Sequence, residues 1–264
     1  MASLGLGGAL VGRSHECNWP PEVEDLPPVT VTRLDTAPLA GADIDRAVRS
    51  SMAAGESLFS VDEQTIEALC PDVIITQHLC RICSVSDGYL RETGARVISL
   101  GPRTLAQVIE SVRHLARELG AVAQGEDVAG GMLERIAAVT AKVAGLRRPR
   151  VFLAEWLDPP FVCGHWLPEM VEAAGGKEVL GVAGHRSAST TWEAVRAAKP
   201  ELVVAAPCGY DQARAAREAE GIDAGCPVVA VDAHRYFARP APSLATGVEI
   251  LAGIFHALPR GEAC

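Results

Sequence analysis

The sequence predicts an α/β protein with two Rossmann-like parallel-sheet lobes, joined by a long helical backbone, with a ligand cleft between the lobes. Two observations lead to this fold class. Short apolar runs without polar alternation recur along the chain, which is typical of parallel strands buried on both faces. Helical patterns separate these runs, except near the middle, where two helical patterns follow each other directly. The alternation on either side of that stretch therefore indicates two separate α/β lobes.

The first lobe is expected over residues 1–100, with strands at residues 9–12, 73–76 and 97–100. A helix is predicted over residues 43–54, because its apolar side chains recur at helical spacing. A second helix is predicted over residues 62–69, since it begins at the acidic cap Asp62 and ends before Pro71. The expected order in this lobe is thus strand, two helices and two further strands.

The helical backbone is expected over residues 101–149. Residues 104–119 carry a strong helical period, and residues 127–144 continue as a second helix that stops at Gly145 and Pro149. The second lobe then occupies residues 150–264, with strands at 151–154, 202–205 and 228–231. These strands are rich in Val, Leu and Ala, as expected for the interior of a parallel sheet.

Composition excludes several classes of protein. The chain has 264 residues, of which 48% are hydrophobic and 22% charged, so a sizeable core can form. A formal net charge of -9 argues against nucleic-acid binding, which needs a basic surface. No apolar run reaches the roughly 18 to 20 residues of a membrane span, and the N-terminus lacks the early basic residues of a secretory signal. We therefore expect a cytoplasmic protein whose eight cysteines are reduced.

The segments that follow the predicted strands carry most of the chemically active residues. Ligands bind parallel sheets beyond the carboxyl ends of the strands, so these segments are the expected site. If the lobes face each other, their loops meet across one cleft. The residues in question are His15, Glu16, Cys17, Trp19, Gln77, Cys80 and Cys83 in the first lobe, and Glu155, Trp156, His165, Trp166, Cys208 and Tyr210 in the second.

Cysteine spacing suggests a metal site. Cys80 and Cys83 form a Cys-x-x-Cys pair, which can hold one metal ion or form a redox disulfide. Cys17 and Cys208 would complete a set of four thiolates, suited to zinc or an iron–sulfur cluster. The alternative is that these cysteines are small apolar residues in packed loops.

Aromatic and titratable residues suggest a pocket for a flat, largely apolar ligand. Trp19, Trp156 and Trp166 accompany the two histidines, and Gln77 and Tyr210 are further candidate contacts. His15 and His165 could ligate a metal, bond to the ligand or simply cap a loop. Glu16 and Glu155 could serve as a general base, a metal ligand or an ion-pair partner. No dinucleotide fingerprint, phosphate loop or nucleophile elbow is present in the sequence.

Several segments resemble the cobalamin-binding group of ABC-importer substrate-binding proteins, which have a helical backbone between two lobes. They are residues 10–21, 71–83, 155–162, 164–170 and 206–209. The resemblance covers nearly the whole chain and is nearest to a cytoplasmic-looking, cysteine-containing branch. It implies a corrinoid, haem, iron–siderophore or metal ligand in the cleft, and no catalysis. Compared with the family, the first strand–helix unit is expected to be missing before Leu4.

Two main hypotheses follow. The first is binding of a corrinoid such as cobalamin, or a related metal-containing ligand, with tryptophans packing it and His15 or His165 near its metal. The alternative is a metalloenzyme with a zinc, iron or iron–sulfur centre on cysteine or histidine, in which Glu16 or Glu155 acts as general base. A third interpretation is a thiol-based metal or redox handler. The expected partner is a small molecule or a metal. The sequence does not decide whether the protein forms a homo-oligomer.

Overall fold

The computed structural model describes residues 1–77 and 93–257. The chain divides into two compact units. The first comprises Met1–Gly101 and His114–Gly125, and the second comprises Pro102–Arg113 and Glu126–Cys264. The chain passes between the units just before helix α4 (Leu105–Glu118), within α4 and within α5 (Val122–Val143). These are the two helices predicted at the centre of the chain. Each unit has its own parallel strand pairing, so the predicted α/β class is confirmed.

The first unit contains a parallel pair, β3 (Val73–Gln77) and β4 (Arg96–Leu100), in a register that runs from Val73↔Arg96 to Gln77↔Leu100. Two short strands, β1 (Thr30–Thr32) and β2 (Phe59–Val61), form an antiparallel pair that was not predicted, because three residues are too few to show a period. The predicted helices are confirmed as α1 (Gly41–Ala53) and α2 (Glu63–Leu69). Asp62 caps α2 as expected, since its carboxylate accepts from Thr65 N.

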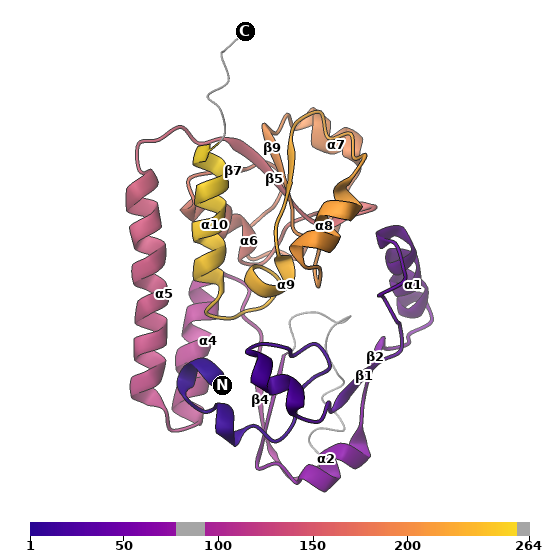
Figure 1. The fold of residues 1–264 in the computed structure, drawn as a ribbon, viewed down its shortest axis with the longest axis vertical. Coiled ribbons are helices and arrows are strands. Elements are labelled where there is room, and N and C mark those ends of the chain that lie inside the picture. The colour runs from indigo at the N-terminus through magenta and orange to yellow at the C-terminus, as the bar shows by residue number, and fades with distance from the viewer. Residues whose placement is uncertain (78–92, 258–264) are drawn as a thin grey trace. The chain divides into compact units, whose positions relative to one another are not determined.

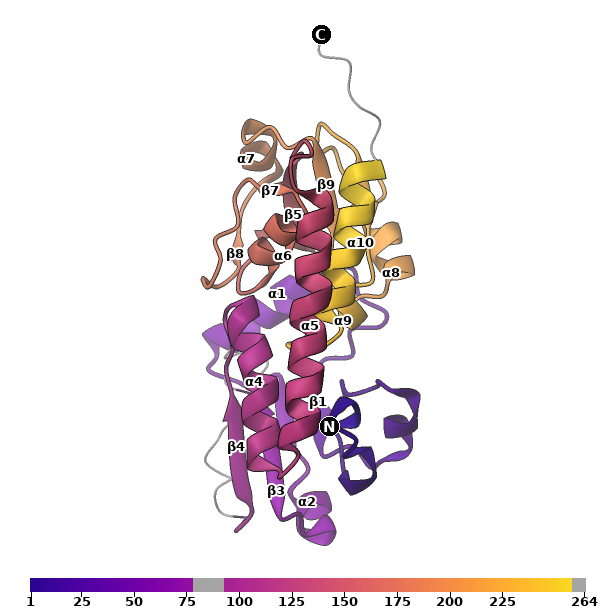
Figure 2. The ribbon, with the colours of Figure 1, turned by 90° about the vertical axis from the view of Figure 1, so that its left-hand side faces the viewer.

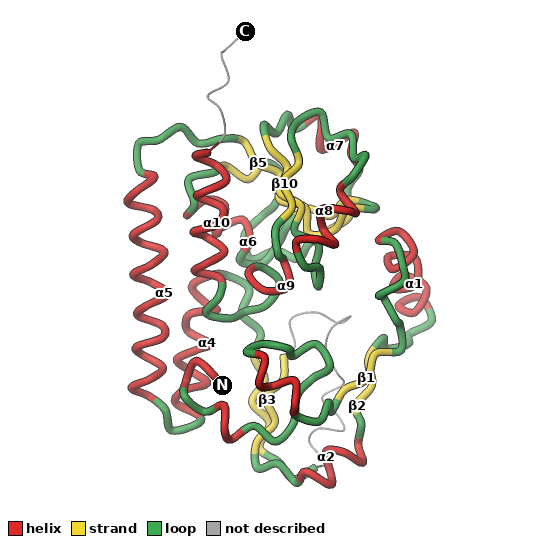
Figure 3. The backbone as a smooth tube through the Cα atoms, viewed as in Figure 1, coloured by secondary structure: helices red, strands yellow, loops and turns green. Residues whose placement is uncertain are grey.

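The strand predicted at residues 9–12 is wrong. Short helical turns, Ala2–Leu4 and Gly7–Ala9, precede it, and an extended loop follows, in which Arg13 makes only an isolated bridge to Pro28. A further turn, Pro21–Asp25, comes before β1. Figure 3 shows this stretch, near the N label, as loop with short helical turns. Proline cannot donate to a ladder, so the partner segment at Pro27 and Pro28 cannot extend the bridge into a strand.

The second unit is built on one sheet with the order β10-β9-β5-β6-β8, and β7 pairs with β5 outside this path. Parallel pairing joins β5 (Arg150–Leu157), β7 (Lys177–Glu178), β9 (Leu202–Ala205) and β10 (Val228–Ala230). Strand β6 (Pro160–Val162) pairs antiparallel with both β5 and β8 (Ala188–Ser189). All four residues of β9 are 0% exposed. This complete burial explains why the predicted strands showed no polar alternation.

Helices surround this sheet: α6 (Leu167–Ala173), α7 (Trp192–Ala197), α8 (Gln212–Ala219), α9 (Ala233–Tyr236) and α10 (Leu244–Ala257). Side chains of Thr191, Asp211 and Asp232 cap α7, α8 and α9. Helix α10 runs beside α5 (Figures 1 and 2). The Arg135 guanidinium on α5 bonds both carboxylate oxygens of Glu249 on α10 at 2.7 and 2.8 Å. Within the described residues, none of the helices is both long and apolar enough for a membrane crossing.

Candidate functional site

In the second unit, the loops beyond three parallel strands are joined by backbone hydrogen bonds. The pairing of β5, β9 and β10 ends at Ala154, Ala205 and Ala230. Beyond that edge, Cys208 N donates to Glu155 O at 3.1 Å. His234 N donates to Tyr210 O at 3.0 Å. The structure thus brings together Glu155, Cys208 and Tyr210 at the carboxyl edge of the sheet, where the sequence placed them.

Two aromatic side chains meet at this edge. The rings of Trp156 and Tyr210 lie edge to face with their centroids 5.2 Å apart. The Arg214 guanidinium lies 4.0 Å from the centroid of the Tyr210 ring. Tyr210 is only 4% exposed, and its hydroxyl has no hydrogen-bond partner in the described part of the chain. Burial raises the pKa of Tyr210, so the hydroxyl stays protonated at neutral pH and can donate to a ligand.

His165 holds an unusual backbone conformation, with φ 50°. Its N donates to His185 O at 2.7 Å, and its O accepts from Gly184 N at 2.9 Å. The imidazole Nε2 is buried and has no partner among the described residues. Burial lowers the pKa of His165, and the positive charges of Arg103 and Arg186 lower it further. The imidazole is therefore neutral at pH 7, with a buried nitrogen available to a ligand.

The residues next to His165 hold its loop in place. Glu155 Oε2 accepts from Gly164 N at 3.0 Å, so this carboxylate links β5 to the loop. Trp166 is 3% exposed, and its Nε1 donates to Phe237 O at 2.8 Å. Its ring centroid lies 5.8 Å from that of His165. Glu155 and Trp166, predicted as a base and a ligand contact, are thus engaged in bonds that brace the histidine loop.

In the first unit, His15 is fixed by Thr30. Thr30 Oγ1 lies 2.9 Å from His15 N and 2.7 Å from His15 Nδ1. The imidazole centroid lies 5.0 Å from that of Phe59. His15 Nε2 is buried and has no hydrogen-bond partner in the described chain, with Glu16 Oε1 at 3.7 Å. Since Nδ1 is engaged, Nε2 is the atom that His15 can offer to a ligand.

The other predicted residues of the first unit lie around this histidine or at a strand end. The Arg13 guanidinium bonds the carbonyl oxygens of His15 and Cys17 at 3.2 and 3.4 Å, and so ties this loop together. Cys17 is half-buried, and Trp19 is 50% exposed. Gln77 is exposed at the end of β3.

The predicted cysteine metal site stays a prediction. Cys80 and Cys83 lie outside the described residues, Cys17 belongs to the first unit and the exposed Cys208 to the second. Across residues 1–77 and 93–257, no three His, Cys, Asp or Glu side chains converge as a metal ion would require.

The roles of Cys163 and Glu178 were not predicted from the sequence. Cys163 is 1% exposed, and its thiol is hydrogen-bonded to the Glu178 carboxylate. Burial raises the pKa of both groups. The only signal in the sequence is an acid followed directly by the apolar residues Val179 and Leu180, which is too weak to single out Glu178.

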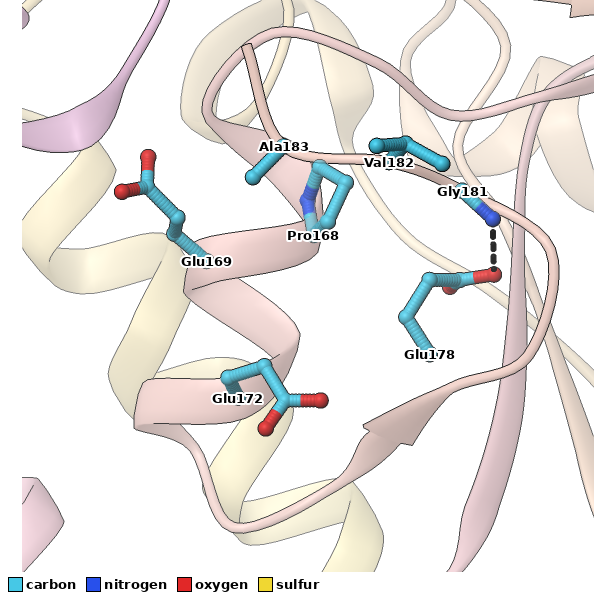
Figure 4. A pocket seen from close by; sticks show the side chains of 7 residues that line it. All are labelled: Pro168, Glu169, Glu172, Glu178, Gly181, Val182 and Ala183. Atoms are coloured by element: carbon cyan, nitrogen blue, oxygen red, sulfur yellow. Dashed lines mark hydrogen bonds between the residues drawn. The ribbon is translucent and has the colours of Figure 1, made fainter. Parts of the chain in front are cut away.

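Glu178 also lines a hollow of about 350 Å³ (Figure 4). Two further carboxylates line it, and each has a partner. Glu169 Oε2 accepts from Leu105 N at 2.6 Å, and Glu172 is paired with Arg148. Because both carboxylates are paired with other residues of the second unit, their observed role is structural.

Comparison with solved structures identifies the fold. The periplasmic vitamin B12 binding protein BtuF of Vibrio cholerae is 18% identical with a TM-score of 0.67, over 97% of this chain and 91% of that one. The periplasmic heme-binding protein RhuT of Roseiflexus sp. RS-1 is 20% identical with a TM-score of 0.69, over 97% and 93%. A periplasmic heme-binding protein of Pseudomonas aeruginosa is 18% identical with a TM-score of 0.71, over 99% and 90%. At these identities the likeness shows the fold alone.

Comparison with family models supplies the family. No match to a curated protein was found. The model described as periplasmic binding protein matches residues 1–226, which is most of the chain. The family to which the sequence motifs pointed is thereby confirmed at its broad level, while the cysteine-containing branch stays a prediction. The chain belongs to the periplasmic binding protein family.

Proposed function

We propose that this protein binds a metal-containing tetrapyrrole, a corrinoid or a haem, without catalysing a reaction on it. The observation that carries the proposal is the buried Nε2 of His165, which has no hydrogen-bond partner within residues 1–77 and 93–257. The names of similar structures support it, since they describe a vitamin B12 binding protein and two heme-binding proteins.

The unpartnered nitrogen favours a ligand that brings its own metal. A buried polar atom left without a partner costs about 1–3 kcal/mol, and a ligand that bonds to it recovers that cost. A bare metal ion takes three or more protein ligands, and the described residues offer no such group. A tetrapyrrole already surrounds its metal with four ring nitrogens, so one imidazole is sufficient.

The surrounding chemistry suits a flat ligand. The half-buried Trp156 offers aromatic surface at this sheet edge and packs on Tyr210, whose hydroxyl can donate to a ligand. Arg214 beside Tyr210 can pair with an acidic substituent of the ligand.

Titration with haemin and with aquocobalamin, followed by absorption spectroscopy, tests the proposal. We expect binding at micromolar concentration or tighter, with a spectrum typical of an imidazole on the metal. His165→Ala should weaken the affinity at least about tenfold and remove that spectrum. His15→Ala, measured separately, shows whether the first unit contributes.

His114→Ala is the matched control, because His114 lies on helix α4 and outside both histidine loops. Absence of any spectral change with both ligands would contradict the proposal. Equal affinities of the His165→Ala and His114→Ala variants would show that His165 is not part of the binding site.

Metal analysis of protein purified without oxygen tests the separate prediction of a metal on Cys17, Cys80, Cys83 and Cys208.

A further inference from the structure

We propose that Glu178 is the positioning residue for His165, acting through the segment 179–185 and through Cys163. The effect on ligand affinity rests on the proposed function, whereas the effect on the histidine itself does not. Glu178 lies at the end of β7, thirteen positions beyond His165 in the sequence, and acts on the histidine through other residues.

The Glu178 carboxylate joins three parts of the second unit. Oε2 accepts from Leu153 N, in the middle of β5, at 3.0 Å. Oε1 accepts from the backbone N–H groups of residues 179, 180 and 181 at 3.0, 3.1 and 3.1 Å. The Cys163 thiol is a fifth donor. Figure 4 shows the bond to Gly181. One side chain therefore fixes where the segment after β7 lies against β5.

Gly181 brings that segment into direct contact with Cys163. A Cβ atom at this position would lie 2.5 Å from Cys163 Sγ and 2.7 Å from Cys163 O. Side chains other than hydrogen cannot fit there without movement of one segment. The turn that the carboxylate organises is thus packed on the backbone two residues before His165.

The same segment then holds His165 from both sides. His185 N donates to Val182 O at 3.2 Å, which closes a turn over residues 182–185. Gly184 N donates to His165 O at 2.9 Å, and His165 N donates to His185 O at 2.7 Å. The left-handed conformation of His165 is disfavoured for a residue with a Cβ, so it depends on these two bonds. The direction of the imidazole consequently depends on the place of the 182–185 turn.

A carboxylate is required because every group facing it is a donor. Both carboxylate oxygens of Glu178 accept hydrogen bonds, so an N–H group in place of either oxygen would face another donor. In Glu178→Gln the amide nitrogen must face either Leu153 N or the three N–H groups of the turn. Either orientation places one donor against another. The variant therefore loses the hydrogen bond to Leu153 N or those to the turn, while the size of the side chain is kept.

The experiment compares Glu178→Gln with Glu172→Gln, first without ligand. Glu172 lines the same hollow, and its carboxylate forms an exposed ion pair with Arg148. We record the backbone and imidazole NMR signals of His165 in histidine-labelled protein, with His165→Ala for assignment. Glu178→Gln should displace or split the His165 signals, while Glu172→Gln should leave them unchanged. His165 signals in Glu178→Gln that match the wild type would overturn the proposal.

Haemin titration is the second readout. If the proposed function holds, Glu178→Gln should weaken the affinity about 10- to 100-fold, as loss of an outer-shell partner does. If the wild type binds neither haemin nor aquocobalamin, the proposed function fails, and the NMR comparison still decides the role of Glu178.

Should Glu178→Gln not fold, Gly184→Ala provides an independent test. It acts at the other end of the segment, where φ is +75°, and a Cβ would meet only Thr104 Cγ2 at 3.6 Å. The change should move the His165 signals without altering the carboxylate. Unchanged signals would show that the segment does not position the histidine.

Discussion

Replacement of Gly164 by alanine should destabilise the second unit, because the position is closed by backbone. A Cβ there would lie 2.5 Å from His185 O, 2.6 Å from Ser187 N and 2.8 Å from Arg186 C. All three distances are shorter than those at which a Cβ atom approaches other heavy atoms in proteins. The contacted atoms belong to the backbone, which cannot rotate away as a side chain can. Gly164 is not in the left-handed region, so the expected effect is purely steric.

The magnitude follows from what has to move. Overpacking of this kind costs about 1–3 kcal/mol. His185 O also accepts from His165 N at 2.7 Å, so its displacement weakens a hydrogen bond that contributes about 1 kcal/mol. The lower entropy of the unfolded alanine chain offsets about 0.4–1 kcal/mol. We expect the free energy of unfolding to fall by about 2–3 kcal/mol.

Urea denaturation followed by tryptophan fluorescence measures this loss. Three of the four tryptophans, Trp156, Trp166 and Trp192, lie in the second unit, so the signal reports mainly on it. With a slope of about 2–3 kcal/mol per M, the midpoint should fall by about 1 M. Gly253→Ala is the control, since Gly253 is exposed within α10 with open space around it, and alanine there should raise stability by up to about 1 kcal/mol. An unchanged midpoint for Gly164→Ala would refute the steric reasoning.

Three further predictions concern stability. Trp166→Phe should lower the free energy of unfolding by about 1–3 kcal/mol, because Phe237 O loses its buried donor; denaturation of the variant measures this, and a loss below about 0.5 kcal/mol would contradict it. Bonds from the hydroxyl and N of Thr65 hold the pKa of Asp62 below its usual range. Its contribution to stability should therefore be complete above about pH 4 and lost as the pH falls further, and Asp62→Asn should flatten this part of the stability–pH profile relative to wild type. Arg135→Ala removes an exposed ion pair, so the thermal midpoint should fall only slightly, for a cost within about 1 kcal/mol, and a larger fall would show that the pair is needed to hold α10.

Local sequence was sufficient for the buried parallel strands of four or more residues and for the capped helix α2. Residues 151–154 and 202–205 are apolar because they are buried on both faces, and that burial leaves the same continuous pattern in any parallel sheet. Helix α2 was predicted to within a residue, because its cap acts across only three positions. Glu155 and Cys208 were placed together from the topology rule for strand ends, before any contact between them was known.

The segment at residues 9–12 shows where a local pattern fails. Its apolar residues resemble a strand, but a strand also needs a partner with free N–H groups, and the segment facing Arg13 begins with two prolines. Strands β1, β2, β7 and β8 contain two or three residues each, so their pairing is decided by contacts distant in the sequence.

The sequence by itself determined the α/β class, the longer parallel strands, helices α1, α2, α4 and α5, and the residues that follow β5 and β9 at the sheet edge, because burial and capping act on neighbouring positions. The tertiary structure alone decided how those residues are used. It showed that Trp166 bonds Phe237 across 71 positions, that Glu178 gathers five donors, and that His165 Nε2 has no partner in the described part of the chain. Hydrogen bonds between segments distant in the sequence leave no period or spacing, so only the folded chain reveals which polar groups are satisfied and which remain for a ligand.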